Sequence, residues 1–315
     1  MPSPARVAVI GLAVALTAAC GPDLAKQNFP RTTISASPAA GPVNDEAVSV
    51  ANLRTIDTCA LLDANTLAGL GKVDPHSADV FKLGECGVDV VDAGGKKISL
   101  DLQLADLAIN AQVTGTIEGL PLEVNDDNGG CDAAAITDKS DSLAMTVHVN
   151  YPGGDACGAG RTALQEVLQR LHTNPPRVAQ PAGSLVAVDF CTVVEDSTIT
   201  GALGRGSKKS VYGLHGCSWS GGLASGYLEY DTALAPSTQD GDQIDLGGGL
   251  TGYQKLETNA GKRCTITWLH LPARDGRGEV VSFQYNNYHD DAGNDDACGK
   301  TQTVVKSLLP KLPRA

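Results

Sequence analysis

The spacing of the cysteines constrains the fold of this chain more than any other feature. Eight of its nine cysteines form two sets of four, and the second set follows the first at offsets of 132, 131, 133 and 141 residues. The two sets are Cys59, Cys86, Cys131, Cys157 and Cys191, Cys217, Cys264, Cys298. A near-constant offset indicates a tandem repeat, and a repeat determines the architecture of the whole chain. We therefore predict two copies of one module.

The residues around the last cysteine of each set repeat most clearly. The tetrapeptide Asp-Ala-Cys-Gly occurs at residues 155–158 and again at 296–299. In both copies apolar residues follow the cysteine at positions +7, +10, +11 and +14, which is the spacing of one face of an α-helix. The tetrapeptide therefore predicts the start of each module's closing helix, and we interpret it as a structural signature.

Alternating apolar residues predict the strands of each module. In the segment KISLDLQL at 97–104 every second residue is apolar, and the alternation recurs at 143–151. The second copy has comparable segments at 225–231, 264–271 and 279–285. Strict alternation is typical of antiparallel strands with one buried face. With a short helix near the first cysteine, each module is predicted to be α+β, an antiparallel sheet with an opening and a closing helix.

The cysteine order leaves more than one disulfide pattern open, because four cysteines in a module allow three pairings. We favour the first cysteine with the second and the third with the fourth. This pattern joins the opening helix to the first hairpin and the closing helix to a strand. A bridge that closes about 27 residues contributes roughly 3.5 kcal/mol in the loop-entropy model. Such bridges would compensate for cores with few aromatic residues, which make up 4% of the chain.

The N-terminal segment predicts export. Residues 1–19 are interpreted as a signal peptide, because the apolar run from Val7 to Ala19 is too short to span a bilayer. The run ends in Thr-Ala-Ala-Cys, which resembles a bacterial lipobox. Cys20 is therefore predicted to carry acyl chains that hold the protein at a membrane. Residues 20–52 are predicted to be this cysteine and a flexible tether rich in Pro, Ser and Ala.

The repeat and the prolines set the remaining boundaries. Residues 53–173 are assigned to the first module, 174–183 to a linker and 184–315 to the second module. The first module carries 8 basic against 18 acidic residues, and the second carries 12 against 15. The net charge of −12 argues against nucleic acid as a partner. An anionic partner would prefer the second module.

Several of these motifs together suggest a family. The lipobox, the tether, an Asp-x-Cys-x-Leu-Leu opening at Asp57 and a Cys-x-Trp motif at Cys217 resemble actinobacterial cell-envelope lipoproteins of an uncharacterised domain family. That family usually has Asp-Pro-Cys at the opening, where this chain has Thr58 and Phe190. A weaker likeness is to the extracellular sensor domains of actinobacterial receptor kinases. The resemblance implies a lipid-anchored envelope protein without an agreed activity.

No motif in the sequence predicts a reaction or a cofactor. The histidines lack the H-x-H and H-x-x-x-H spacings of metal ligands, and the cysteines lack the close pairs of zinc sites. Acidic turns such as 125–130 do not match the spacing of an EF-hand. We therefore expect no metal and no cofactor. Trp219, Tyr227 and Trp268 are candidates for a binding surface, with the core or hairpin pairs as the alternative.

These features favour a non-enzymatic lipoprotein, anchored on the extracytoplasmic face of the cell membrane, that binds a small ligand or an envelope protein. The second module, which is less acidic and richer in aromatic residues, is the preferred contact surface. A groove between the two copies would be a common place for a binding site. Two alternatives remain: an envelope hydrolase that uses scattered carboxylates, and a structural surface spacer.

Overall fold

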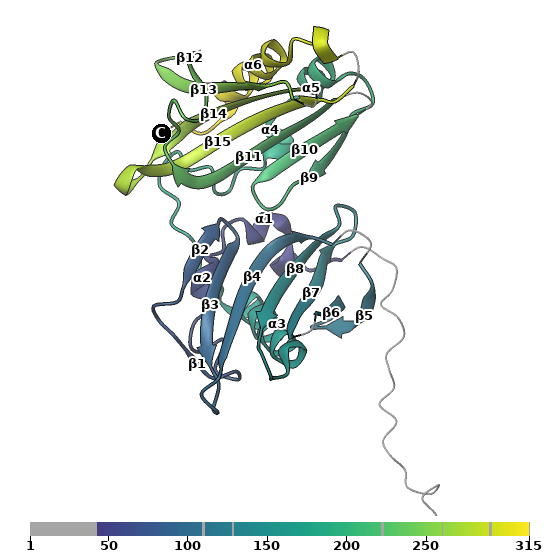
Figure 1. The fold of residues 1–315 in the computed structure, drawn as a ribbon, viewed down its shortest axis with the longest axis vertical. Helices are drawn as coiled ribbons and strands as arrows, with labels where there is room; N and C mark the ends of the chain where they lie inside the picture. Colours follow the sequence, from purple (N-terminus) through teal and green to yellow (C-terminus); the bar gives the residue numbers. More distant parts are fainter. Residues whose placement is uncertain are drawn as a thin grey trace, which may run out of the picture. The chain divides into compact units, whose positions relative to one another are not determined.

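The chain folds into two antiparallel sheets, each with its own helices and disulfides (Figure 1). The computed structural model describes residues 43–108, 111–127, 129–221, 224–259, 261–289 and 292–314, which belong to one compact unit. The predicted signal peptide, Cys20 and most of the predicted tether lie outside the described residues. The predicted α+β fold with two modules is confirmed.

The first module is built on a sheet of eight strands. Its helical segments are η2 (Glu46–Val48), α1 (Val50–Leu53), α2 (Thr58–Leu61) and α3 (Ala156–Thr173). Its strands are β1 (Lys72–Val73), β2 (Asp79–Lys82), β3 (Glu85–Val91), β4 (Lys97–Leu107), β5 (Val113–Ile117), β6 (Leu120–Asp127), β7 (Gly130–Asp138) and β8 (Leu143–Asn150). The strand order is β1-β3-β4-β8-β7-β6-β5, and β2 also pairs with β3. The closing helix α3 packs over β7 and β8 on one face (Figure 1).

The second module is built on a sheet of seven strands. Its helical segments are α4 (Phe190–Val193), α5 (Asp196–Leu203), η3 (Arg274–Gly276), η4 (Ala292–Asn294), α6 (Ala297–Leu308) and η5 (Leu309–Lys311). Its strands are β9 (Lys208–Val211), β10 (Gly216–Gly221), β11 (Ala224–Leu234), β12 (Asp242–Gly247), β13 (Leu250–Glu257), β14 (Lys262–Pro272) and β15 (Arg277–Asn287). The strand order is β12-β13-β14-β15-β11-β10-β9. The closing helix α6 packs on β14 and β15, with α5 beside it (Figure 1).

The two sheets are connected in the same way. In each, a hairpin (β3–β4 or β10–β11) is followed by a four-stranded meander (β5–β8 or β12–β15), whose last strand pairs with the second strand of the hairpin. The registers also agree, because Cys86 lies opposite Leu102 and Cys217 lies opposite Leu228. The sequence repeat is therefore a repeat of strand order and of register.

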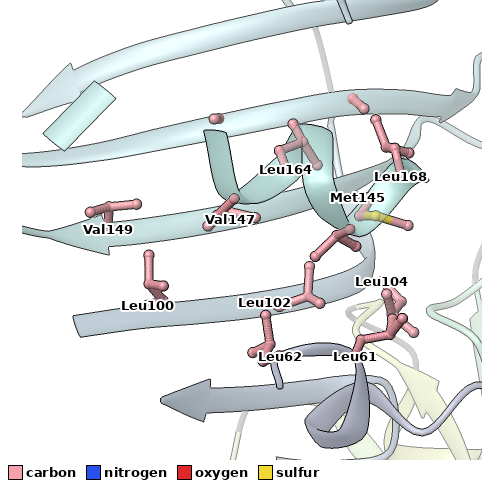
Figure 2. Close-up of a cluster of buried hydrophobic side chains, with 14 of the residues drawn as sticks. Leu61, Leu62, Leu100, Leu102, Leu104, Met145, Val147, Val149, Leu164 and Leu168 are labelled. Atoms are coloured by element: carbon pink, nitrogen blue, oxygen red, sulfur yellow. The ribbon is translucent and has the colours of Figure 1, made fainter. Parts of the chain in front are cut away.

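Each core fills the space between one sheet face and its closing helix. The alternation in β4 buries Leu100, Leu102 and Leu104, each at most 1% exposed. They pack with side chains of α2, β8 and α3, which are Leu61, Leu62, Val147, Val149, Leu164 and Leu168 (Figure 2). The second core holds larger rings, which are Phe190, Trp219, Trp268, Phe283 and Tyr285. Burial of a large apolar side chain contributes about 1.5–3 kcal/mol. Although the chain has few aromatic residues, those in this core are therefore placed where they stabilise the fold most.

The disulfides join the helices to the sheets. The pairs are Cys59–Cys86, Cys131–Cys157, Cys191–Cys217 and Cys264–Cys298. In each module the first bridge ties the opening helix to the first strand of the hairpin, and the second ties a meander strand to the closing helix. The favoured pairing of first with second and third with fourth is confirmed.

The Asp-Ala-Cys-Gly tetrapeptide begins each closing helix, and its outer residues form the helix cap. Asp155 and Asp296 are the N-caps of α3 and α6, and their carboxylates accept hydrogen bonds from the backbone N–H groups of Gly158 and Gly299. A Cβ atom on these two glycines would lie 2.2 Å and 2.0 Å from the capping carboxylate. With the carboxylate in this position a Cβ atom three residues after the aspartate would meet it, so glycine at this position suits the cap in both copies.

Residues 43–52 belong to the first module, so the prediction of a tether that extends to residue 52 is wrong. Val48 is 1% exposed in the first core. Asp45 caps η2, and its carboxylate is 2.8 Å from Nε2 of His172 near the end of α3. The sequence obscures this segment because its helical turns are only three and four residues long, too short to show an apolar period.

Equivalent hairpin turns of the two modules pack against each other's cores. Leu83 packs against the second core, and Leu214 is a 5%-exposed member of the first core. The Leu83 N–H donates to the carboxylate of Asp231 at 3.0 Å. Arg54 donates through Nε to the Leu214 carbonyl at 2.8 Å and pairs with Asp189 at 3.1 Å. The modules are therefore joined by apolar and polar contacts as well as by the linker.

Candidate binding face of the second module

The second sheet has a core face and a polar face because its strands alternate. On β15, Val281, Phe283 and Tyr285 are fully buried in the core, whereas the intervening Ser282 and Gln284 are half-buried on the other side. Since α6 covers the core face only, these polar side chains form the floor of a surface that the closing helix leaves open.

Three cross-strand rows make up this floor. The central row is Thr265, Gln284 and Tyr227, from β14, β15 and β11. The rows on either side are Thr267, Ser282, Glu229 and Arg263, Asn286, Ser225. Successive rows are about 6.8 Å apart, because they lie two positions apart along each strand and a strand rises about 3.4 Å per residue. The floor is therefore a regular grid of side chains that donate and accept hydrogen bonds.

Two adjoining hollows lie on the floor. The first has a volume of about 480 Å³ and is lined by Tyr212, Tyr227, Glu229, Arg263, Thr265, Thr267, Ser282, Gln284, Asn286 and Tyr288. The second, of about 570 Å³, shares Asn286 and Tyr288 with the first and continues past Ser225 to Lys208 and His289. We call the two hollows together the polar groove. Each hollow has the volume of a small-molecule binding site.

Tyrosine rings border the first hollow of the polar groove. The rings of Tyr212 and Tyr227 meet edge to face with their centroids 5.7 Å apart. The Tyr288 hydroxyl accepts a hydrogen bond from Nη2 of Arg263 at 2.8 Å. Tyr212 and Tyr288 are 41% and 56% exposed. Amphipathic rings of this kind are enriched where proteins bind ligands, because they combine a flat apolar face with a polar tip.

The charged groups of the first hollow already have partners. Arg263 donates through Nε to the amide oxygen of Asn286 at 3.1 Å, and Nη1 is 3.4 Å from the Glu257 carboxylate. The hydrogen bond to Tyr288, with the nearby charge of Glu257, raises the pKa of Arg263. The Glu229 carboxylate accepts from the Ser282 hydroxyl at 3.2 Å. In this hollow Arg263 is therefore paired with a carboxylate, whereas the Glu229 carboxylate has a neutral hydroxyl as its partner.

The matching row of the first module has different chemistry. There the cross-strand row reads Asp132, His148 and Asp101, at the positions of Thr265, Gln284 and Tyr227. Nδ1 of His148 is 2.6 Å from the Asp132 carboxylate. Burial raises the pKa of Asp101. The two modules have the same strand order and register, but the side chains that form the polar groove occur only in the second module.

Of the three residues predicted from the sequence to form a binding surface, one lies in the polar groove and two lie in the core. Tyr227 lines the polar groove. Trp219 and Trp268 are 2% and 0% exposed in the second core, so their assignment to a binding surface is wrong and the core alternative holds. The sequence reasoning also missed Arg263 and Gln284 on the floor. Their alternation with the buried residues of β14 and β15 is the signal that could have indicated them.

Within the part of the chain that the structure describes, no helix is long and apolar enough to cross a membrane. Among those same residues, no three or more His, Cys, Asp and Glu side chains gather in a way that could hold a metal ion.

Comparisons with known proteins leave the family open. No protein-family profile matches the chain, and no curated protein matches it. Among solved structures, the chain is similar to one described as the crystal structure of MucB in complex with MucA(peri), at 12% identity over 82% of this chain and 100% of that chain, with a TM-score of 0.18. A likeness of this size carries no argument about the fold or the function.

Proposed function

We propose that the protein is a non-enzymatic binding protein of the cell envelope. Acyl chains on Cys20 hold it on the extracytoplasmic face of the cell membrane, and the polar groove of the second module binds its ligand. The observation that carries this proposal is the groove itself, a row-ordered floor of polar side chains bordered by exposed tyrosines.

The disulfides support the extracytoplasmic location. Four bridges join helices to sheets in this chain, and disulfides form and persist in oxidising compartments outside the cytoplasm. The lipobox-like sequence before Cys20 adds the expected anchor. Lipidation adds about 0.8 kcal/mol of membrane affinity for each buried CH₂ group, so several acyl chains hold a protein at a membrane without a spanning helix.

The test is site-specific photocrosslinking in the native host. A benzoylphenylalanine at Tyr227 places the reactive group in the polar groove and preserves an aromatic ring there. The matched control carries it at Thr303, an exposed residue of α6 on the other side of the same sheet. We expect an adduct from position 227 in the membrane fraction and none from position 303.

Two further results complete this test. With Cys20→Ala, the position-227 protein should leave the membrane fraction, because the anchor is lost. Equal labelling at positions 227 and 303, or no labelling at either, would contradict the proposal that the polar groove is the working surface.

A further inference from the structure

We propose that the ligand of the polar groove is an uncharged carbohydrate chain. This inference rests on the proposed function and specifies the chemistry of the ligand at the same site. Three properties of the groove carry it: the scarcity of aliphatic side chains among its described lining residues, the engagement of its Arg263 by other side chains, and the combination of tyrosine rings with amides and hydroxyls.

The lining excludes a lipid as the ligand. Among the described residues, the lining of the first hollow contains no Leu, Ile, Val or Met, and Ala224 is the largest aliphatic side chain that the lining of the second adds. An acyl chain would gain its affinity from contact with such side chains, since apolar burial drives its transfer from water. The polar groove offers an acyl chain only tyrosine edges and polar dipoles.

The charges of the first hollow argue against a strongly charged ligand. Arg263 is engaged by Asn286, Tyr288 and Glu257. Glu229 is engaged by Ser282. An anionic ligand would have to displace the partners of Arg263 and would meet the carboxylate of Glu229, so it would lose solvation without gaining a free counter-charge. Lys208, which could attract an anion, lies at the far end of the second hollow and away from the lining of the first.

The floor matches the hydrogen-bonding of sugar hydroxyls. Thr265, Thr267, Ser282 and Gln284 each carry a group that donates and accepts. A sugar hydroxyl also does both, so it can donate to the oxygens of Ser282 and Thr265, whose own hydrogens point to Glu229 and Gln284, and can accept from the Gln284 amide N–H groups. Because a buried polar group without a partner costs about 1–3 kcal/mol, a floor of this composition selects a ligand that is itself rich in hydroxyls.

The tyrosines supply the apolar complement. One face of a sugar ring carries C–H groups, which pack on the flat face of an aromatic ring. Tyr227 lies in the central row of the floor, and Tyr288 lies at the junction of the two hollows. Rings at two places along a continuous groove suit a chain of several sugar units.

The experiment is NMR and calorimetric titration of the full-length oxidised protein in detergent. The probes are maltohexaose, cellohexaose, α-1,6-mannohexaose, xylohexaose and chitohexaose. We expect at least one of them to shift the amide signals of β11, β14 and β15 specifically. Tyr227→Ala and Gln284→Leu should each weaken that binding at least tenfold, whereas Tyr227→Phe, which keeps the ring, and Thr303→Ala should leave it within about twofold.

The outcomes separate this inference from the proposed function. Failure of every oligosaccharide to bind at concentrations up to about 10 mM, or binding that Tyr227→Ala leaves unchanged in a folded protein, would overturn the carbohydrate assignment. Binding of phosphatidylglycerol vesicles or of the crosslinked envelope protein to the groove instead would overturn it as well. In that case the proposed function would stand, provided that crosslinking at position 227 still succeeds.

Discussion

His215 is a buried titratable residue whose pKa is strongly shifted by its surroundings. It is 7% exposed, and its ring meets Tyr230 edge to face at 5.1 Å. Its Nδ1 has no hydrogen-bond partner among the described residues. Burial lowers the pKa of His215 to about 3, and the positive charge of Arg54 acts in the same direction. The ring is therefore neutral in the folded protein over the whole physiological range.

This burial predicts a loss of stability in acid. Above pH 6.5 the ring is neutral in both the folded and the unfolded chain, so it contributes no pH dependence. As the pH falls from about 6.5 towards 3, only the unfolded chain takes up the proton, and the free energy of unfolding decreases by about 1.4 kcal/mol per pH unit. His215→Phe should remove this slope in denaturant titrations at several pH values.

His172 provides a control, because its contribution to the unfolding free energy depends on pH in the opposite direction. Its hydrogen bond to Asp45 raises the pKa of His172, so its contribution is fully present below pH 6.5 and is lost as the pH rises through the folded-state pKa. His172→Gln should therefore change the unfolding free energy most at acidic pH. A slope between pH 6.5 and about 5 that is unchanged in His215→Phe would contradict the assignment to His215, because carboxylates with lowered pKa values, such as Asp89, add their own loss of stability only at lower pH.

At the scale of single residues, the sequence could have indicated that the two tryptophans face the core and that Tyr227 does not. Trp219 lies two positions after Cys217, and Trp268 lies four positions after Cys264. Even spacing places these residues on the same face of a strand as the bridged cysteines, and that face points to the core. The positions of Arg263 and Tyr288 in one groove could not be predicted, because they depend on the pairing register of β14 and β15.

At the scale of elements, strong alternation predicted the strands well and weak alternation did not. The segment 97–104 became β4 (Lys97–Leu107), because its apolar residues all face one core. The edge strand β12 was not predicted, because only Ile244 and Leu246 face the core and its other residues are exposed. Two alternating apolar residues are too few to indicate a strand, which pairs through its backbone with β13.

The caps of the closing helices give a prediction at this scale. Asp155→Ala and Asp296→Ala each remove a side chain that satisfies a free N–H group in the first helical turn. Each should lower the free energy of unfolding by about 1 kcal/mol, measured by urea denaturation. Arg161→Ala, an exposed change on α3, is the control and should stay within about 0.5 kcal/mol. No loss in either aspartate variant would show that the tetrapeptide repeats for another reason.

At the scale of the whole molecule, the cysteine repeat predicted two modules of one fold. It could not predict their contact, because Arg54 and Leu214 are separated by 160 residues and neither belongs to a repeated motif that signals pairing. Nor could it predict that the two open faces would differ, with Asp132, His148 and Asp101 in one and Thr265, Gln284 and Tyr227 in the other. The two modules share strand order, register and disulfide positions, while their cores and their open faces carry different side chains.

The central claim is that the two modules, each with two internal disulfides, work outside the cytoplasm and are anchored at the membrane. Intact mass spectrometry of the protein from membrane and culture fractions of the native host, alkylated before and after reduction, tests it most directly. We predict a membrane-bound chain that begins at an acylated Cys20 and has eight cysteines that alkylate only after reduction. A chain without acyl groups, or free thiols before reduction, would contradict the claim.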